Sequence, residues 1–180
     1  AMRCIVVCAS RSHGNTRKIA DVMAEVLDAR VVSPADVDAS ELASHDLVGF
    51  GSGVYAMRLD AELRELVDAL PPGEGRHVFV FATSGAPELP WMGFTREVRN
   101  ALESRGYRLD GTFTCRGWDT WGPLGCLGGV NRGRPNAGDL RNAERFAAKL
   151  RDRHEAGGSH VAAPHGVLTT GRRAPTPATR

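Results

Sequence analysis

Short apolar runs alternate along the chain with longer segments in which apolar residues recur every three or four positions. The runs are rich in Val, Ile and Phe and predict five buried strands, at 3–9, 30–33, 46–51, 76–83 and 107–115. The periodic segments predict amphipathic helices, at 16–27, 59–70, 94–102 and 139–151. Strands that alternate with helices pair in parallel through right-handed crossovers, so the expected fold class is α/β with a doubly wound sheet.

This fold class draws attention to the loops that follow strands. In open parallel sheets, ligands bind beyond the carboxyl ends of the strands. Polar residues and glycines directly after a predicted strand are therefore the first candidates for a binding site.

The C-terminal segment has a different composition from the rest of the chain. Residues 156–180 contain no aromatic residue and are rich in Gly, Ala, Pro and Thr. Such a segment buries too little apolar surface to offset the entropy lost on ordering. We expect one domain, 2–154, followed by a flexible C-terminal tail, 155–180.

The net charge of +2 is also concentrated in that tail. Three arginines and one glutamate lie in 155–180, so residues 1–154 sum to zero. A neutral body provides no electrostatic reason to expect nucleic-acid binding.

The apolar runs and the cysteines indicate the cellular compartment in which the protein is expected. No apolar run approaches the roughly 18 residues of a membrane span, and the first residues predict a strand rather than a signal peptide. The four cysteines are scattered and do not form a disulfide framework. The expected location is therefore the cytoplasm, with reduced thiols.

The loop after the first predicted strand is the strongest candidate site. Ser10, Ser12 and Thr16 supply hydroxyls, Asn15 supplies an amide, and Gly14 permits close backbone approach. Free N–H groups and the helix dipole at this junction favour a phosphate. Neither G-x-x-x-x-G-K-[ST] nor G-x-G-x-x-G is present, so triphosphate chemistry is not expected. The alternative interpretation is an ordinary helix N-cap.

Several loops together resemble those of the flavodoxins. Segment 10–16 resembles the loop that holds the FMN phosphate, 51–55 the second, flavin-contacting loop, and 83–87 the third loop. Segments 115–123 and 128–136 resemble a branch of small flavodoxin-like proteins. The resemblance implies a three-layer α/β/α fold with five parallel strands in the order 2-1-3-4-5.

The resemblance also implies one bound FMN and neither a metal nor a catalytic side chain. The implied cofactor-binding residues are Ser10, Arg11, Ser12, His13, Gly14, Asn15, Thr16, Ser52, Gly53, Val54, Tyr55, Thr83, Ser84, Gly85 and Trp118. Two features depart from the family pattern. The first loop is one residue longer, with Arg11 and His13, and the body is neutral where electron-carrying flavodoxins are acidic.

Individual residues keep two interpretations each. Tyr55 either stacks on the flavin ring or is an ordinary buried tyrosine at a helix entrance, and Trp118 either stacks or plugs the sheet end. Arg58 lies near the ring or simply in solvent. Cys115 and Cys126 are either a redox pair or unrelated thiols, and the spacing of the six histidines favours no metal site.

The resemblance implies electron transfer through the exposed edge of a bound flavin, to a redox partner protein or a small-molecule acceptor. One alternative is an FMN-dependent oxidoreductase acting on a quinone or a small biosynthetic intermediate. Another is a non-redox scaffold whose basic tail contacts a partner. The sequence leaves the oligomeric state open.

Overall fold

A parallel β-sheet forms the centre of the computed structural model, which describes residues 2–11, 14–85, 93–117 and 131–158. Its parallel strands are β1 (Cys4–Ala9), β2 (Arg30–Val32), β3 (Leu47–Tyr55), β5 (His77–Ser84) and β6 (Arg108–Arg116). They lie in the order β2-β1-β3-β5-β6, and the short strand β4 (Arg58–Leu59) pairs antiparallel with β3. Counting the five predicted strands along the chain, this is the predicted order 2-1-3-4-5.

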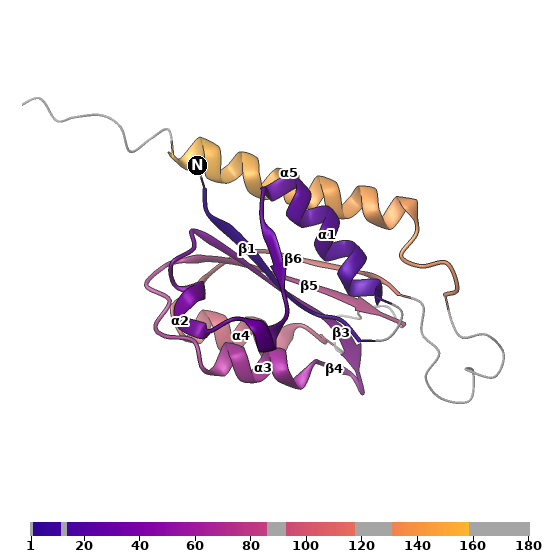
Figure 1. Cartoon of the computed structure of the whole chain (residues 1–180), viewed down its shortest axis with the longest axis horizontal. Helices are drawn as coiled ribbons and strands as arrows, with labels where there is room; N and C mark the ends of the chain where they lie inside the picture. Colours follow the sequence, from indigo (N-terminus) through magenta and orange to yellow (C-terminus); the bar gives the residue numbers. More distant parts are fainter. Residues whose placement is uncertain (1, 12–13, 86–92, 118–130, 159–180) are drawn as a thin grey trace, which may run out of the picture.

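Helices cover both faces of the sheet (Figure 1). Helices α1 (Asn15–Leu27) and α5 (Ala137–Gly158) lie on one face. On the other lie α2 (Ala39–Leu42), α3 (Ala61–Asp68) and α4 (Arg96–Ser104), with the 3₁₀ turn η2 (Pro34–Asp36). The predicted three-layer α/β/α architecture is confirmed.

Side-chain alternation along the strands produces two apolar cores, one under each helical layer. On β1, Ile5 and Val7 face the α3–α4 layer, whereas Val6 faces α1 and α5. A Cβ atom at Gly51 would lie 1.9 Å from the ring of Phe81 on the neighbouring strand. Glycine at this position therefore lets the ring cross the adjacent strand, where any side chain would clash.

The structure differs from the sequence prediction at two element ends. Strand β3 continues to Tyr55 instead of ending at 51, because it turns back at residues 56–57 to pair with β4. Helix α5 continues to Gly158, past both its predicted end at 151 and the predicted domain boundary at 154. Residues 155–158 are thus helical.

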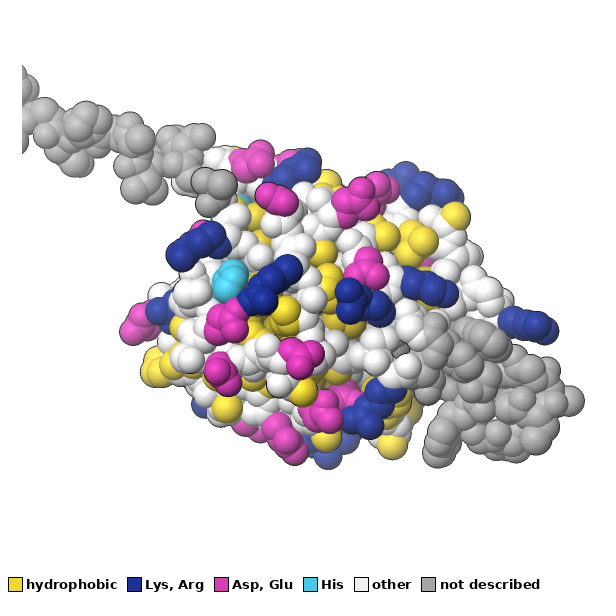
Figure 2. All heavy atoms as spheres, viewed as in Figure 1, with side chains coloured by type: hydrophobic (Ala, Val, Ile, Leu, Met, Phe, Trp, Pro, Cys, Tyr) yellow, Lys and Arg dark blue, Asp and Glu magenta, His cyan; other side chains and the backbone are white. Residues whose placement is uncertain are grey.

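Charged side chains are mixed over the visible surface. Figure 2 shows acidic and basic groups interspersed on one face, in keeping with the neutral body. Within the described part of the chain, no helix combines the length and apolar character that crossing a bilayer requires.

Candidate functional site

The loops that follow β1, β3, β5 and β6 meet at the carboxyl end of the sheet. A hydrogen bond of 2.7 Å joins the hydroxyls of Thr16 and Thr83, which lie 67 residues apart in sequence. Both side chains are buried. The first and third predicted loops are therefore in direct contact.

The first loop leads into α1 through a left-handed residue. Gly14 has φ 62° and ψ 23° and has no side chain with which to cap the helix. Ser10 Oγ, at the start of the loop, accepts a hydrogen bond from the N–H of Arg17 at 3.3 Å. The first N–H groups of a helix have no partner within the helix, so an anion at this junction would meet the positive end of the helix dipole. Asn15 and Thr16 are buried at this junction.

The second loop is organised by Asp60, a residue that sequence reasoning missed. Its carboxylate caps α3 by accepting from the N–H of Glu62 at 2.9 Å. Its backbone N–H donates to Ser52 Oγ at 2.8 Å, and Ser52 Oγ donates to the Gly53 carbonyl at 2.6 Å. Asp60 is only 3% exposed. The available signal was an acidic residue directly before an amphipathic helix, which is typical of an N-cap.

Arg11 joins the first loop to the second. Its Nε donates to Asp60 Oδ2 at 2.6 Å, and its backbone N–H donates to the Tyr55 hydroxyl at 3.2 Å. The hydrogen bond to Asp60 raises the pKa of Arg11. Burial raises the pKa of Tyr55, so its hydroxyl stays protonated around neutral pH. Gly53 makes room for this tyrosine, because a Cβ there would lie 2.6 Å from the hydroxyl oxygen. Val54, between them, packs against the core.

The third loop is bound to the end of β6. The Gly85 carbonyl accepts from Arg116 Nη1 at 2.7 Å and from Asn131 Nδ2 at 2.8 Å. The Ser84 carbonyl accepts from the Gly117 N–H at 3.0 Å. A Cβ at Gly117 would lie 2.9 Å from the side-chain amide of Asn15, so glycine lets β6 approach the first loop.

A capping box begins α5. The Asn136 side chain accepts from the N–H of Asp139 at 3.0 Å, and Asp139 accepts from the N–H of Asn136 at 2.8 Å. Both oxygens of Asp139 also accept from Arg134 Nη1 at 2.7 Å. These bonds fix the conformation of residues 134–139 at the start of α5.

Arg58 is paired with an acid. Its Nη2 lies 2.5 Å from Glu97 Oε1, and its side chain is 56% exposed. The bond to Arg58 lowers the pKa of Glu97. Arg11 is likewise paired with Asp60. The positive charges of Arg11 and Arg58 are therefore balanced by the carboxylates of Asp60 and Glu97.

Three predicted site residues, Ser12, His13 and Trp118, lie outside the described residues, as does Cys126. Burial raises the pKa of Cys115 to about 12, and the pKa of Cys4 and Cys8 likewise. A thiol with such a pKa is a poor nucleophile near neutral pH. Cys115 is half-buried and lacks the lowered pKa of a reactive thiol, and its pairing with Cys126 stays a prediction because Cys126 lies outside the described residues.

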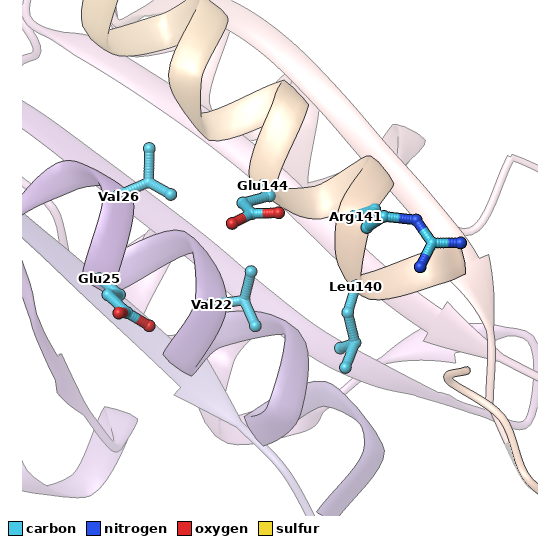
Figure 3. Close-up of a pocket in the computed structure, with 6 residues that line it drawn as sticks. All are labelled: Val22, Glu25, Val26, Leu140, Arg141 and Glu144. Atoms are coloured by element: carbon cyan, nitrogen blue, oxygen red, sulfur yellow. The ribbon is translucent and has the colours of Figure 1, made fainter. Parts of the chain in front are cut away.

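A hollow of about 290 Å³ lies between α1 and α5, away from these loops. Val22 and Val26 of α1 face Leu140 and Glu144 of α5 across it (Figure 3). No predicted site residue lines it. Among the described residues, the predicted site residues lie in the loops that follow β1, β3 and β5, and not around this hollow.

A family model described as a flavodoxin domain matches residues 5–112 of this chain. An uncharacterized protein of Methanocaldococcus jannaschii is 33% identical over 149 residues, which make up 83% of this chain and 98% of that protein.

Solved structures with the same fold include three described as flavodoxins. Oxidised flavodoxin 2 from Bacillus cereus has a TM-score of 0.64 at 22% identity, over 84% of this chain and 99% of its own. A flavodoxin from the domain Archaea has a TM-score of 0.61 at 18% identity, over 86% of this chain and 99% of its own. A WrbA-like flavodoxin from Agrobacterium tumefaciens has a TM-score of 0.59 at 17% identity, over 87% of this chain and 99% of its own. At these identities the likeness concerns the fold.

Proposed function

Since this chain belongs to the flavodoxin domain family, whose members are flavin-binding proteins, we propose that it binds FMN and transfers electrons through the exposed edge of the flavin. The observation that carries the proposal is the convergence of three loops on one helix N-terminus. Thr16 bonds to Thr83, and Arg11 bonds to both Tyr55 and Asp60.

The phosphate of FMN is assigned to the first loop. Its ligands are the N–H groups and hydroxyls of Ser10, Ser12, Gly14, Asn15 and Thr16. Gly14 fits this role because, within the described residues, no atom lies within 4 Å of the position its Cβ would take. A phosphate can therefore approach the backbone N–H groups directly.

The flavin ring is assigned to the second and third loops, and the family resemblance adds Trp118 as a further expected contact. Backbone groups of Ser52, Gly53, Thr83 and Gly85 would orient its polar edge, and Val54 and Tyr55 would flank the ring. Bound FMN would supply the electron-accepting chemistry, and the chain holds the ring and excludes water from it.

The neutral body favours a second candidate function. Paired arginines at the site make this end of the sheet less negative than an acidic carrier would be. A less negative site suits the reduced, anionic flavin and exchange with a neutral small acceptor such as a quinone. The alternative is therefore an FMN-dependent oxidoreductase. We place either function in the cytoplasm, because the cysteines form no disulfide framework.

Titration of the apoprotein with FMN and with riboflavin tests the cofactor assignment. FMN should bind at least about tenfold more tightly, because charge-assisted hydrogen bonds to its phosphate are strong. Ser10→Ala should weaken FMN binding several-fold and leave riboflavin binding unchanged. Ser104→Ala, at the end of α4, is the matched control and should change neither. Equal affinities for FMN and riboflavin would remove the phosphate from the first loop.

Measurements of electron exchange distinguish an electron carrier, an oxidoreductase and a non-redox scaffold. A carrier should accept electrons from a flavodoxin reductase and show little turnover with a quinone alone. An oxidoreductase should turn over with the quinone. A non-redox scaffold should purify colourless and fail to bind FMN, and this outcome would reject the proposed function.

A further inference from the structure

A second polar cluster lies at the opposite end of the sheet from loops 10–16, 51–55 and 83–87, which the proposed function assigns to FMN and which are called the flavin loops below. His77 begins β5, Asp110 lies near the start of β6, and His154 lies near the end of α5. Strand β5 runs from His77 to Ser84, so this cluster is about 23 Å from the third loop at the usual rise per residue. The cluster is therefore separate from the proposed flavin site.

A β-bulge positions the carboxylate of Asp110. The register between β5 and β6 passes from Val78↔Leu109 to Phe79↔Gly111, which leaves Asp110 as the extra residue. Bulges re-aim a side chain and are enriched beside functional sites. Here the Asp110 side chain is directed toward His154 on α5 and is only 6% exposed.

Donor atoms from three elements converge there. Nδ1 of His77 lies 2.8 and 3.0 Å from the two carboxylate oxygens of Asp110, and Nε2 of His154 lies 2.7 Å from Oδ2. All three ligand atoms lie within 4.8 Å of one another. The imidazole rings pack edge to face with centroids 4.6 Å apart.

Two imidazole nitrogens and one carboxylate oxygen form a donor set typical of zinc and its first-row neighbours, whereas magnesium and calcium prefer oxygen alone. We propose that His77, Asp110 and His154 bind a divalent transition-metal ion of the zinc type, with water completing the coordination. The ion replaces the hydrogen bonds to Asp110 and fastens the last turns of α5 to β5 and β6.

The two hydrogen-bonded pairs require only a small adjustment, and the two imidazole nitrogens, which lie within 4.8 Å of one another, come together on the ion to a similar separation. In a tetrahedral site with ligands at about 2.0–2.1 Å from the metal, neighbouring ligand atoms are roughly 3.3 Å apart. The hydrogen-bonded pairs are at 2.7–3.0 Å, so they need to separate by a few tenths of an ångström. His77, with 34% of its side chain exposed, lies at the open side through which an ion can enter.

One neighbouring charge opposes the ion. Arg153 Nη1 donates to the backbone carbonyl of Asp110 at 2.8 Å, which brings a guanidinium close to the site. Coulomb repulsion between this guanidinium and a dication weakens binding. We therefore expect weaker zinc binding than in a zinc finger, and a readily reversible site.

Calorimetric titration of the chelator-treated, full-length protein with ZnCl₂ tests the site. Wild type should bind one zinc ion at this site and melt at a higher temperature when zinc is added. His154→Gln, His77→Gln and Asp110→Asn should each weaken that binding by at least about tenfold, since even changes beside a metal ligand cost this much. Each replacement can still hydrogen-bond, which limits damage to the fold.

Control variants test three of the other four histidines, His45, His160 and His165. His45→Gln, whose ring bonds to Glu41 on a different element, and the double variant His160→Gln/His165→Gln should leave the site's affinity unchanged. Hydrogen exchange in the last turns of α5 should slow with zinc in wild type and not in His154→Gln. Zinc binding that is absent in wild type, or equal in wild type and His154→Gln, would overturn the proposal. FMN affinity should not respond to zinc, so this result is independent of the flavin assignment.

Discussion

Two side-chain contacts, one buried and one partly exposed, hold the first loop to its neighbours at the residue scale. Thr16 and Thr83 satisfy each other's hydroxyls in a buried environment. Arg11 and Asp60 form a charge-assisted hydrogen bond, in which the carboxylate is buried and the guanidinium is 58% exposed. A buried polar group that loses its partner bears its full desolvation cost. Loop geometry therefore depends on these partners being present together.

Replacing Thr16 by valine should lower the free energy of unfolding by about 1–3 kcal/mol, because the Thr83 hydroxyl is left buried without its partner. FMN affinity should fall as well. Chemical denaturation of the variant measures the first effect, and flavin titration measures the second.

Two further variants isolate the hydrogen bond. Thr16→Val/Thr83→Val removes both hydroxyls and should recover much of the lost stability. Thr114→Val, on an exposed position of β6, should change stability by less than about 0.5 kcal/mol. A Thr16→Val variant as stable as wild type would contradict the account.

The β3–β4 hairpin is the least regular element beside the site. Its turn residues Ala56 and Met57 have φ angles of 48° and 66°, the left-handed region that favours glycine or asparagine. Such conformations cost L-residues about 1–2 kcal/mol each. Met57 is also 47% exposed.

Replacing Met57 by glycine should raise the free energy of unfolding by about 0.5–1 kcal/mol, because the relief of left-handed strain exceeds the entropy that glycine adds to the unfolded chain. Denaturant titration measures this change. Met57→Leu keeps the strain and should have the stability of wild type. A destabilised Met57→Gly would show that the side chain, rather than the backbone, supports the turn.

At the scale of the whole molecule, a neutral body is followed by a basic C-terminal segment. The core closes with α5, whose Ala143, Ala147 and Leu150 are buried against the sheet. His154, near the end of this helix, bonds to Asp110. The positive net charge of the chain comes from arginines beyond the helix.

Deleting residues 159–180 should leave the melting temperature and the FMN affinity unchanged, because this segment has no aromatic residue and few large apolar ones. Differential scanning calorimetry and flavin titration measure these two quantities. A truncation after Arg153 is the matched control. It also removes His154 and should lower the melting temperature by several degrees. A comparable loss in the shorter deletion would show that residues 159–180 pack on the body.

The sequence by itself determined the layers and the end of the sheet at which its polar loops lie. Apolar periodicity is a local property of the chain, so strand and helix types, and hence a doubly wound sheet, follow from it. The position of polar loops after strands follows in turn, because parallel strands bring their carboxyl ends to one edge. The sequence missed β4, because residues 56–57 lack the Asn-Gly or Asp-Gly pair that predicts a tight turn.

Only the tertiary structure decided which side chains meet. Arg11 and Asp60 are 49 residues apart, and Asp110 lies 33 and 44 residues from its two histidines. The Asp110 side chain is re-aimed by a bulge that no periodicity records. Pairings of this kind depend on strand register and helix packing, which arise when distant segments are buried together, and a local pattern carries no information about them.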